Sequence, residues 1–459
     1  MNFNMYFLNF NPVLITITFK GKISTGYRYF CYKNKPMIAA NNTALQSWVE
    51  VKPESDFPIQ NLPFGIFRTE NLTPRVGVAI GEYIIDLKSL HVLGYFSNLS
   101  FTLSDFDSAY LNPIIQRGKT ATRELRERLS VLLQDSNTEL QGKEHHVNQC
   151  LIKQDQAQML IPVDIRDYTD FYSSIEHATN VGTMFRDPNN ALLPNWKHLP
   201  VGYHGRASSI IVSGQNFHRP KGQQKPNETE PPVFGPSKLL DFELEMAFIT
   251  YPGKELGESI STDEADEFIF GLCLFNDWSA RDIQKWEYVP LGPFLAKSFA
   301  SSVSPWIVPL DAFEPFRIEG PKQDVEVLPY LKSTGAKNID IKLEVAIQPE
   351  DSKESVVCNS NFKYMYWNMN QQLAHHTVNG CNINTGDMLA SGTISGPTPD
   401  SYGSMLELSW RGSKPLTLTD GSERKFINDH DTVIMRGHAS NGTTRIGFGE
   451  VKSKVLPAK

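Results

Sequence analysis

Two glutamates on one predicted strand constrain this chain more than any other feature of its sequence. Residues 241–249 alternate polar and apolar side chains with a period of two, which is typical of a half-buried β-strand. Glu243 and Glu245 therefore share one face of the strand, and the apolar residues between them fill the other. Neighbouring carboxylates on one face repel each other. The pattern predicts either a cation bound between them or an edge strand whose acids are exposed to water.

A third acid favours the cation. Asp277 follows a second apolar segment, residues 268–275, which also reads as a strand. Carboxylate oxygens without sulfur or imidazole ligands suit a hard cation such as Mg²⁺ or Ca²⁺ and do not suit zinc. We therefore expect a metal site at the ends of these two strands.

The segment after Asp277 predicts a helix with one polar face. Residues 279–287 form the expected helix, with Ser279 or Asp277 as the N-cap. Side chains spaced by four, seven and eleven residues fall on one helix face, and here they are Asp277, Arg281, Gln284 and Tyr288. Such a stripe either faces solvent or lines a site, and the strand carboxylates favour a site.

A histidine in another polar segment is a candidate base. Residues 167–182 contain a fourth acid, Asp170, and His177. A histidine titrates near neutral pH and can take a proton from water. Such a base needs a carboxylate to fix its tautomer, and Glu407, in a predicted alternating strand at 404–410, is a candidate. A lone histidine is more often structural, which is our interpretation of the pair at 375–376.

Lys297 lies among apolar and turn-forming residues in 291–299. It either extends its amine to solvent or donates to substrate oxygens. The polar turn at 392–396 lacks the spacing of a phosphate loop, and the chain contains no dinucleotide fingerprint and no nucleophile elbow.

The composition excludes several classes of protein. A formal net charge of −7 over 459 residues gives no attraction to nucleic acid or to an anionic membrane. Five scattered cysteines without paired spacing predict free thiols in a reducing compartment, consistent with a cytoplasmic protein. No apolar run approaches the length of a membrane span.

The chain divides into three parts by pattern. Residues 1–45 contain basic residues and no acid. This suggests a targeting segment or, as we prefer, an over-extended start with Met37 as the working initiator, and we expect it to add no core. Residues 46–160 predict a small β-rich domain with a hairpin at 76–85 and a helix at 119–136. Residues 161–459 predict a large, mostly β domain with helices at 279–287 and 363–376.

Several segments together resemble the fumarylacetoacetate hydrolase family in the same order along the chain: 167–182, 199–209, 239–246, 276–299, 389–396 and 403–410, with 56–65 similar to the start of its members. The resemblance runs from about residue 50 to the C-terminus. It implies a mainly β (α+β) fold, with a small SH3-like β-barrel domain followed by a large mixed β-sandwich or β-roll. It also implies a homodimer.

The resemblance assigns roles to individual residues. It implies that Ca²⁺ (or Mg²⁺) is bound by Asp170, Glu243, Glu245 and Asp277. A second cation, Mg²⁺, would lie near Asp277, Lys297 and Ser301, where Ala300-Ser301 replaces a Gly-Thr pair and keeps the hydroxyl. His177 would be the base, oriented by Glu407. Arg281, Gln284 and Lys297 would stabilise negative charge. The substrate would be held by Tyr172, Arg186, Tyr203, Gln284, Tyr288 and Thr393.

The reaction implied is hydrolysis of a carbon–carbon bond in a diketo acid, 4-fumarylacetoacetate, to fumarate and acetoacetate. This is the last step of tyrosine and phenylalanine catabolism. Two alternatives are another enzyme of the superfamily, such as an acylpyruvate hydrolase or an oxaloacetate-type decarboxylase, and a catalytically silent metal-binding protein. The first would share the acidic triplet but lack the His177 segment, and the second would lack the base or a donor.

Overall fold

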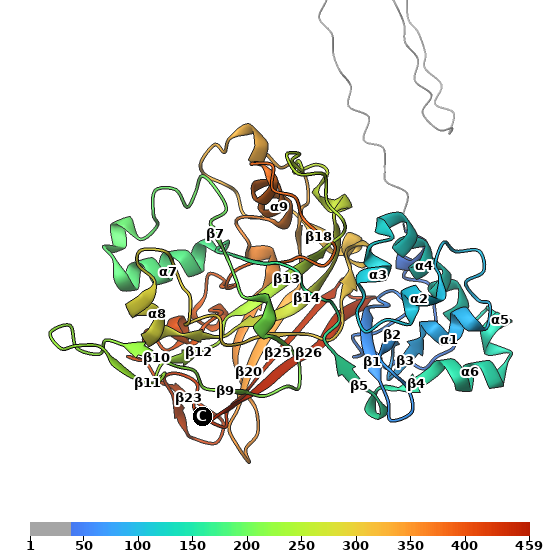
Figure 1. Ribbon diagram of the computed structural model, residues 1–459, viewed down its shortest axis with the longest axis horizontal. Coiled ribbons are helices and arrows are strands. Elements are labelled where there is room, and N and C mark those ends of the chain that lie inside the picture. Colours follow the sequence, from blue (N-terminus) through green and yellow to red (C-terminus); the bar gives the residue numbers. More distant parts are fainter. Residues whose placement is uncertain (1–37) are drawn as a thin grey trace, which may run out of the picture. The chain divides into compact units, whose positions relative to one another are not determined.

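Residues 38–459 are the part of the chain that the computed structural model describes, and they form one unit. The mainly β architecture expected from the sequence is confirmed, since long strands form the body of the molecule and most helices are short (Figure 1). None of the helices in this part is long and apolar enough to cross a membrane. Its four cysteines, at 150, 273, 358 and 381, form no disulfide.

The N-terminal part is built on a five-stranded antiparallel sheet. Its strands lie in the order β4 (Leu151–Lys153), β3 (Tyr83–Asp86), β2 (Arg75–Ile80), β1 (Phe64–Arg68) and β5 (Gln158–Leu160). The predicted hairpin is confirmed as β2 and β3, and Gly81 in its turn has a φ of +54°. Six helices accompany the sheet: α1 (Leu87–Val92), α2 (Leu103–Phe106), α3 (Asn112–Ile115), α4 (Gly118–Leu133), α5 (Thr138–Gln141) and α6 (Glu144–Cys150). Only α4 was expected from its apolar periodicity, because the other five are too short to show one.

The C-terminal part contains the sheet that carries the acidic residues. Its strands are β7 (Gly202–His204), β6 (Tyr168–Phe171), β22 (Met388–Ala390), β13 (Leu244–Thr250), β14 (Ile269–Asp277), β16 (Ser301–Val303) and β8 (Ile210–Val212), and β17 (Val308–Pro309) also pairs with β14. The sheet mixes parallel and antiparallel pairs. Its neighbouring strands come from distant parts of the chain, which brings residues near 170, 245 and 277 together.

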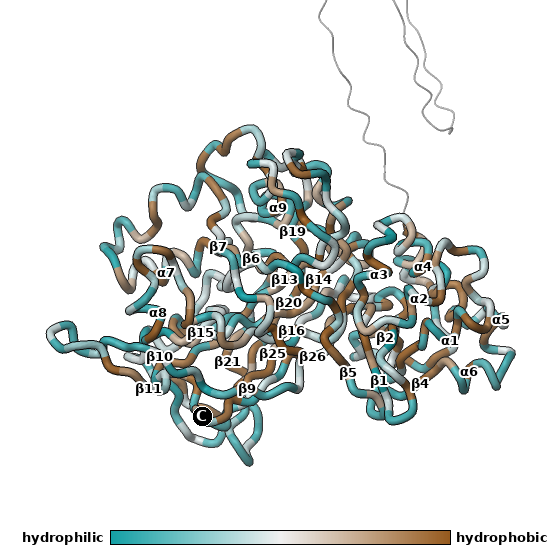
Figure 2. The backbone as a smooth tube through the Cα atoms, viewed as in Figure 1, coloured by the Kyte–Doolittle hydropathy of each residue, from teal (hydrophilic) through white to brown (hydrophobic). Residues whose placement is uncertain are grey.

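A second, five-stranded sheet completes this part. Its order is β21 (Ser355–Asn361), β20 (Lys342–Gln348), β25 (Thr432–Ser440), β26 (Arg445–Leu456) and β9 (Phe217–His218). Two-stranded ribbons are formed by β10 (Lys221–Gln224) with β11 (Val233–Pro236), β12 (Leu240–Asp241) with β15 (Ser279–Ala280), β18 (Arg317–Ile318) with β19 (Asn338–Ile339), and β23 (Leu416–Thr417) with β24 (Glu423–Arg424). The helices are α7 (Ile175–Phe185), α8 (Arg281–Glu287), α9 (Met369–Thr377) and α10 (Met405–Leu408). Figure 2 shows apolar residues gathered on the central strands and polar residues at the tip of the β10–β11 hairpin.

Strand β13 is buried on both faces, and this differs from the half-buried strand expected. Leu244, Met246 and Phe248 belong to the core between the two large sheets. Ala247 and Ile249, on the opposite face, belong to a second core that includes the N-terminal sheet and α4. Glu243 and Glu245 share that second face and are 5% and 0% exposed. The interpretation of residues 241–249 as an exposed edge strand is therefore wrong, and the carboxylates of both glutamates lie inside the protein.

Residues 38–45 correct another expectation. They were predicted to add no core, yet Ala39–Asn41 form a 3₁₀ turn in which Ala40 and Asn41 are buried. The Asn41 amide donates to the carbonyl of Asp311 at 2.7 Å. The rest of the predicted extension, residues 1–37, lies outside the described residues. For the remainder of the chain we propose the division made from the sequence, a domain at 46–160 and a catalytic domain at 161–459.

Candidate active site

Four buried carboxylates converge at one point of the eight-stranded sheet. Each of Asp170, Glu243, Glu245 and Asp277 offers one oxygen, and these atoms all lie within 4.8 Å of one another. Asp170 is on β6 and Glu245 is on β13, while Asp277 is the last residue of β14. Glu243 stands just before β13, and its carbonyl accepts from the backbone N–H of Asp277. The structure thus brings together the four acids that the sequence analysis assigned to a metal.

The sheet must curve for these acids to meet. Tyr203 on β7 is the direct cross-strand partner of Asp170 on β6. Its hydroxyl also donates to Oδ2 of Asp277 at 3.1 Å, although β14 lies four strands away from β7 in the sheet. The concave face therefore encloses the four carboxylates.

The electrostatics of the cluster call for positive charge. Burial, and next the charge of Asp277, raise the pKa of Asp170 well above its usual range. Burial and the neighbouring acids raise the pKa of Glu245 in the same way. Asp170 Oδ1 and Glu245 Oε1 are also buried without a hydrogen-bond partner. Because buried acceptors are almost always satisfied, these two oxygens fit ligands of a cation.

Two basic side chains neutralise part of the charge. Lys297 donates to Oδ2 of Asp277 at 2.6 Å and also to Glu243. Burial alone would lower the pKa of Lys297, but Asp277 and Glu243 outweigh it and raise the pKa. Burial would likewise raise the pKa of Glu243, but Lys297 and Arg281 outweigh it and hold that pKa low. Lys297 is therefore a charged donor, and its ammonium has no lone pair to offer a metal.

Arg281 joins this cluster to the helix that follows it. As the first residue of α8, it donates to Asp241 and to Glu243, both at 2.7 Å. It also donates to Oε1 of Gln284 at 3.2 Å. Three of the five N–H groups of a guanidinium are thereby used.

The donor set fits a divalent cation. It consists of oxygen atoms from four carboxylates, with hydroxyl groups of Tyr203 and Ser301 beside them. Hard cations such as Ca²⁺ and Mg²⁺ prefer oxygen ligands. A divalent ion would satisfy the two unpartnered oxygens and offset the repulsion among the four acids.

A second buried pair lies beside the carboxylates. Nδ1 of His177 and Oε2 of Glu407 are 2.6 Å apart, and the side chains are 3% and 0% exposed. Glu407 also accepts hydrogen bonds from Asn180, Ser395 and Ser404, at 2.8 to 2.9 Å. Burial alone would raise the pKa of Glu407, but the charge and hydrogen bond of His177 outweigh it and lower the pKa. With Nδ1 held by a carboxylate, the other ring nitrogen of His177 is the one available for proton transfer.

One turn connects the two centres. Gly392 donates its backbone N–H to Oε2 of Glu245 at 2.9 Å, and Ser395 donates its hydroxyl to Glu407. Gly392 has a φ of +77°, and a Cβ there would lie 2.2 Å from the carbonyl oxygen of Phe171. Only glycine fits this close approach. The turn that lacked a phosphate-loop signature therefore connects the cluster of four carboxylates to the His–Glu pair.

The remaining predicted site residues surround these centres in different ways. The ring of Tyr172 packs edge-on against His177, with centroids 5.2 Å apart. Thr393 is buried in the connecting turn, and Ser301 donates to Oδ1 of Asp277 at 2.8 Å. Arg186 is exposed and donates to the carbonyl of Ala191. Tyr288 is 52% exposed at the C-terminal end of α8.

Two local predictions were wrong. Glu407 is in a short helix, α10, and not in a strand, because Ser404 caps it and accepts from the backbone N–H of Glu407. Asp277 ends β14 and does not begin the helical stripe, since α8 starts at Arg281 after Ala280, which makes no side-chain cap. The sequence analysis also missed Asn180, Ser395 and Ser404 around Glu407. The Ser-x-x-Glu spacing of 404–407 is a helix-start signature and could have indicated α10.

Comparisons with known proteins agree with this geometry. The family described as "Fumarylacetoacetate (FAA) hydrolase C-terminal" matches residues 167–456, and "Fumarylacetoacetase N-terminal" matches residues 60–162. The chain is 54% identical to the fumarylacetoacetase of Bos taurus and to that of Homo sapiens, over 90% of this chain and 99% of each relative. It is 52% identical to the fumarylacetoacetase of Caenorhabditis elegans, over 90% of this chain and all of that protein.

The fold and the site are those of a hydrolytic enzyme in which four buried carboxylates that could hold a divalent cation lie beside a His–Glu pair. The chain belongs to the fumarylacetoacetate hydrolase family.

Proposed function

We propose that this enzyme hydrolyses the carbon–carbon bond of 4-fumarylacetoacetate to fumarate and acetoacetate, the last step of tyrosine and phenylalanine catabolism. The observation that carries the proposal is the buried pair of His177 and Glu407, joined through the 392–395 turn to four convergent carboxylates. High identity over nearly the whole length of curated fumarylacetoacetases supports it.

His177 is the base that takes a proton from the attacking water. Its Nδ1 is held by Glu407 at 2.6 Å, so the lone pair for this step is on Nε2. Glu407 keeps the ring oriented and stabilises the imidazolium that forms. The three other donors to Glu407 keep its carboxylate in place. No serine or cysteine nucleophile is needed for direct attack of water on the ketone.

The leaving carbanion needs its charge placed on oxygen. Lys297 uses two of its three N–H groups on Glu243 and Asp277 and keeps one for substrate. Arg281 keeps N–H groups beyond those given to Asp241, Glu243 and Gln284. These donors stabilise the developing oxyanion and enolate in a buried site, where such hydrogen bonds are strong. Tyr172, Arg186, Tyr203, Gln284, Tyr288 and Thr393 hold the rest of the diketo acid.

Asp170, Glu243, Glu245 and Asp277 would hold Ca²⁺, or Mg²⁺ in its place. A cation held there would supply Lewis acidity toward the carbonyl groups of the diketo acid. A second cation, Mg²⁺, would lie near Asp277, Lys297 and Ser301, with the Ser301 hydroxyl as an oxygen donor. A homodimer in the cytoplasm completes the proposal. The free cysteines and the family resemblance support these two points.

The first experiment follows the ultraviolet absorbance of fumarylacetoacetate in the presence of purified protein. It is run with added Ca²⁺ or Mg²⁺ and with a chelator, and fumarate and acetoacetate are assayed at the end. Loss of absorbance with release of both products, abolished by the chelator, is the expected result. No turnover by folded protein with either metal would overturn the proposal in favour of another acylpyruvate-type substrate on the same site.

Replacing the base tests the mechanism separately. His177→Ala is expected to lower kcat by orders of magnitude while the fold and metal binding persist. The matched control is His145→Ala, since His145 is exposed on α6 in the N-terminal part. Turnover by His177→Ala close to that of the control would remove His177 as the base.

A further inference from the structure

Tyr168 is a buried phenol to which the mechanism above gives no role. It is the first residue of β6, and Asp170 follows two positions later on the same face of that strand. Its side chain is 3% exposed, and its hydroxyl has no hydrogen-bond partner. Since a buried tyrosine hydroxyl usually finds a partner, this group needs an explanation.

The ring is held firmly in place. Gly205 lies against one side of it, where a Cβ would come within 2.1 Å of two ring carbons. The backbone N–H of Gly205 donates to the carbonyl of Tyr168 at 2.8 Å. Phe275 meets the ring edge-on, with centroids 5.4 Å apart. This packing keeps the ring on the acid-bearing face of β6, so that a hydrogen bond to a carboxylate requires the acid side chain to turn toward the phenol.

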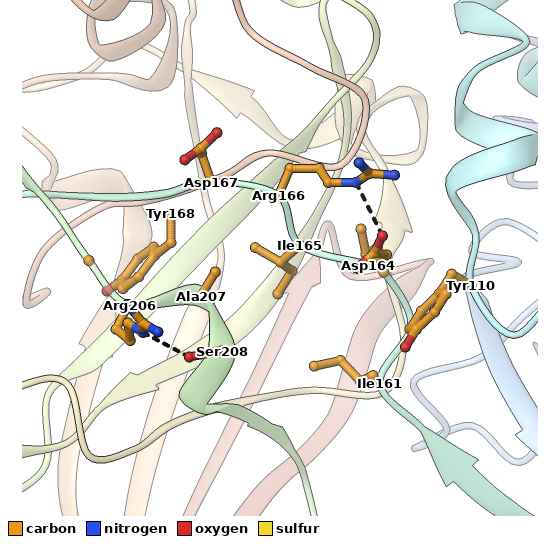
Figure 3. A pocket seen from close by; sticks show the side chains of 12 residues that line it. Tyr110, Ile161, Asp164, Ile165, Arg166, Asp167, Tyr168, Arg206, Ala207 and Ser208 are labelled. Atoms are coloured by element: carbon orange, nitrogen blue, oxygen red, sulfur yellow. Dashed lines mark hydrogen bonds and ion pairs between the residues drawn. The ribbon is translucent and has the colours of Figure 1, made fainter.

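Tyr168 borders a cleft and shares a strand face with one of the four acids, Asp170. Figure 3 shows Tyr168 on the wall of this cleft, which is lined by residues 161–168 and the segment 205–208. The cleft has a volume of about 510 Å³. The hydroxyl of Tyr168 is thus a buried donor without a partner on the strand face that carries Asp170.

The cluster contains one unsatisfied donor and two unsatisfied acceptors. The donor is the Tyr168 hydroxyl, and the acceptors are Oδ1 of Asp170 and Oε1 of Glu245. Glu245 is the cross-strand partner of Phe275, the residue that packs against the tyrosine ring. Asp170 stands next to Tyr168 along its own strand face. Asp170 is thus related to Tyr168 along its own strand, and Glu245 is related to it through Phe275.

We propose that Tyr168 is a positioning residue of the metal centre, whose hydroxyl donates to the carboxylate of Asp170 or Glu245 and orients it toward a divalent cation. This inference rests on the proposed metal centre. A hydrogen bond to a ligating carboxylate fixes its direction, and loss of such a partner typically weakens metal binding by about 10- to 100-fold. A neutral phenol can do this without adding charge to the four acids.

Tyr168→Phe tests the proposal because it keeps the ring and removes only the hydroxyl. Ca²⁺ affinity of the full chain is measured by titration calorimetry after treatment with a chelator. The variant is expected to bind Ca²⁺ about 10- to 100-fold more weakly than the parent. The melting temperature of the metal-free variant should equal or exceed that of the parent, since an unsatisfied buried group is removed. Saturating Ca²⁺ should restore the parental kcat.

The matched control is Tyr251→Phe. Tyr251 is another buried tyrosine, but its hydroxyl is bonded to Thr122 at 2.5 Å and it lies away from the acids. The control should lower the melting temperature and leave Ca²⁺ affinity unchanged. Tyr168→Phe is therefore expected to weaken Ca²⁺ binding without lowering the melting temperature. Tyr251→Phe is expected to lower the melting temperature without changing Ca²⁺ affinity.

The outcomes separate this inference from the proposed function. If the parent protein binds neither Ca²⁺ nor Mg²⁺, the proposed metal centre fails and the role of Tyr168 fails with it. If the parent binds Ca²⁺ and Tyr168→Phe binds it equally well, only the role of Tyr168 is overturned. Weaker binding together with a lower metal-free melting temperature would also overturn it, since the hydroxyl would then stabilise the fold itself.

Discussion

Nδ1 of His177 lies 2.6 Å from Oε2 of Glu407, although 230 residues separate them in the chain. Ser174 caps the helix that carries the histidine, and Ser404 caps the helix that carries the glutamate. Each capping side chain therefore fixes the start of a helix that presents one member of the pair. The connecting turn at 392–395 then holds the pair next to the four convergent carboxylates.

Glu407→Gln is expected to lower kcat on the order of 10²- to 10⁴-fold. The amide keeps the size of the carboxylate but cannot stabilise a protonated His177. Steady-state turnover of fumarylacetoacetate measures the loss, and circular dichroism checks the fold.

Glu176→Gln is the neighbouring control, since Glu176 is on the same helix as His177 and is only partly buried. It should retain nearly full turnover. An equal loss in both variants would mean that negative charge in the neighbourhood of His177 matters, and not the pairing of Glu407 with His177.

Glu245→Gln should separate the two states of the metal site. Without metal, burial and then the neighbouring acids raise the pKa of Glu245, so a neutral amide should leave the melting temperature equal or higher. With Ca²⁺ at about 100 times its Kd, the parent gains about 2.7 kcal/mol by mass action, and the variant should lose most of that gain. Differential scanning calorimetry with Ca²⁺ or with a chelator measures both.

Glu344→Gln, on β20, is the control and should keep the full Ca²⁺ stabilisation. A variant at Glu245 that is stabilised by Ca²⁺ as strongly as the parent would show that this oxygen is not a ligand.

The strand patterns in the sequence predicted much of the fold, but they could not show what packs against each face of a strand. The alternation in 241–249 correctly put Glu243 and Glu245 on one side. It could not show that Ala247 and Ile249 on that side pack against the N-terminal part. The only sequence signal for this packing was the apolar character of Ala247 and Ile249, and apolar residues also occur on exposed strands.

Pairings across the chain could be expected for some site residues and not for others. His177 and Glu407 were matched by chemistry and resemblance, and the structure brings them together. Asn180 and Ser395, which hold Glu407, have side chains common in loops and helix caps, so nothing in their spacing marked them. Ser404 could have been found from its Ser-x-x-Glu spacing with Glu407. The role of Asp241 as a partner of Arg281 was missed in the same way, because only the paired sheet brings β12 to the start of α8.

His438 should make the protein less stable as the pH falls. Burial, and next Arg445 and Lys342, lower its pKa from 6.5 to about 4 in the folded chain. At a pH between these two pKa values, His438 binds a proton in the unfolded chain but not in the folded chain. The free energy of unfolding therefore decreases as the pH falls through this window. His438→Gln should reduce that decrease, measured by urea unfolding at pH 7.5 and pH 5. A similar pH dependence in variant and parent would contradict it, and His145→Gln serves as the exposed control.

Asn41→Ala tests whether the residues before 46 belong to the fold. The Asn41 side chain donates to the carbonyl of Asp311 and accepts from the buried guanidinium of Arg126 at 2.8 Å. Removing it leaves both groups buried without that partner, which should lower the free energy of unfolding by roughly 2 kcal/mol or more. Asn42→Ala is the matched neighbour, because its side chain accepts only an exposed backbone bond from Ala44. Equal stability of the two variants in urea unfolding would show that the contacts of Asn41 do not make residues 38–45 part of the fold.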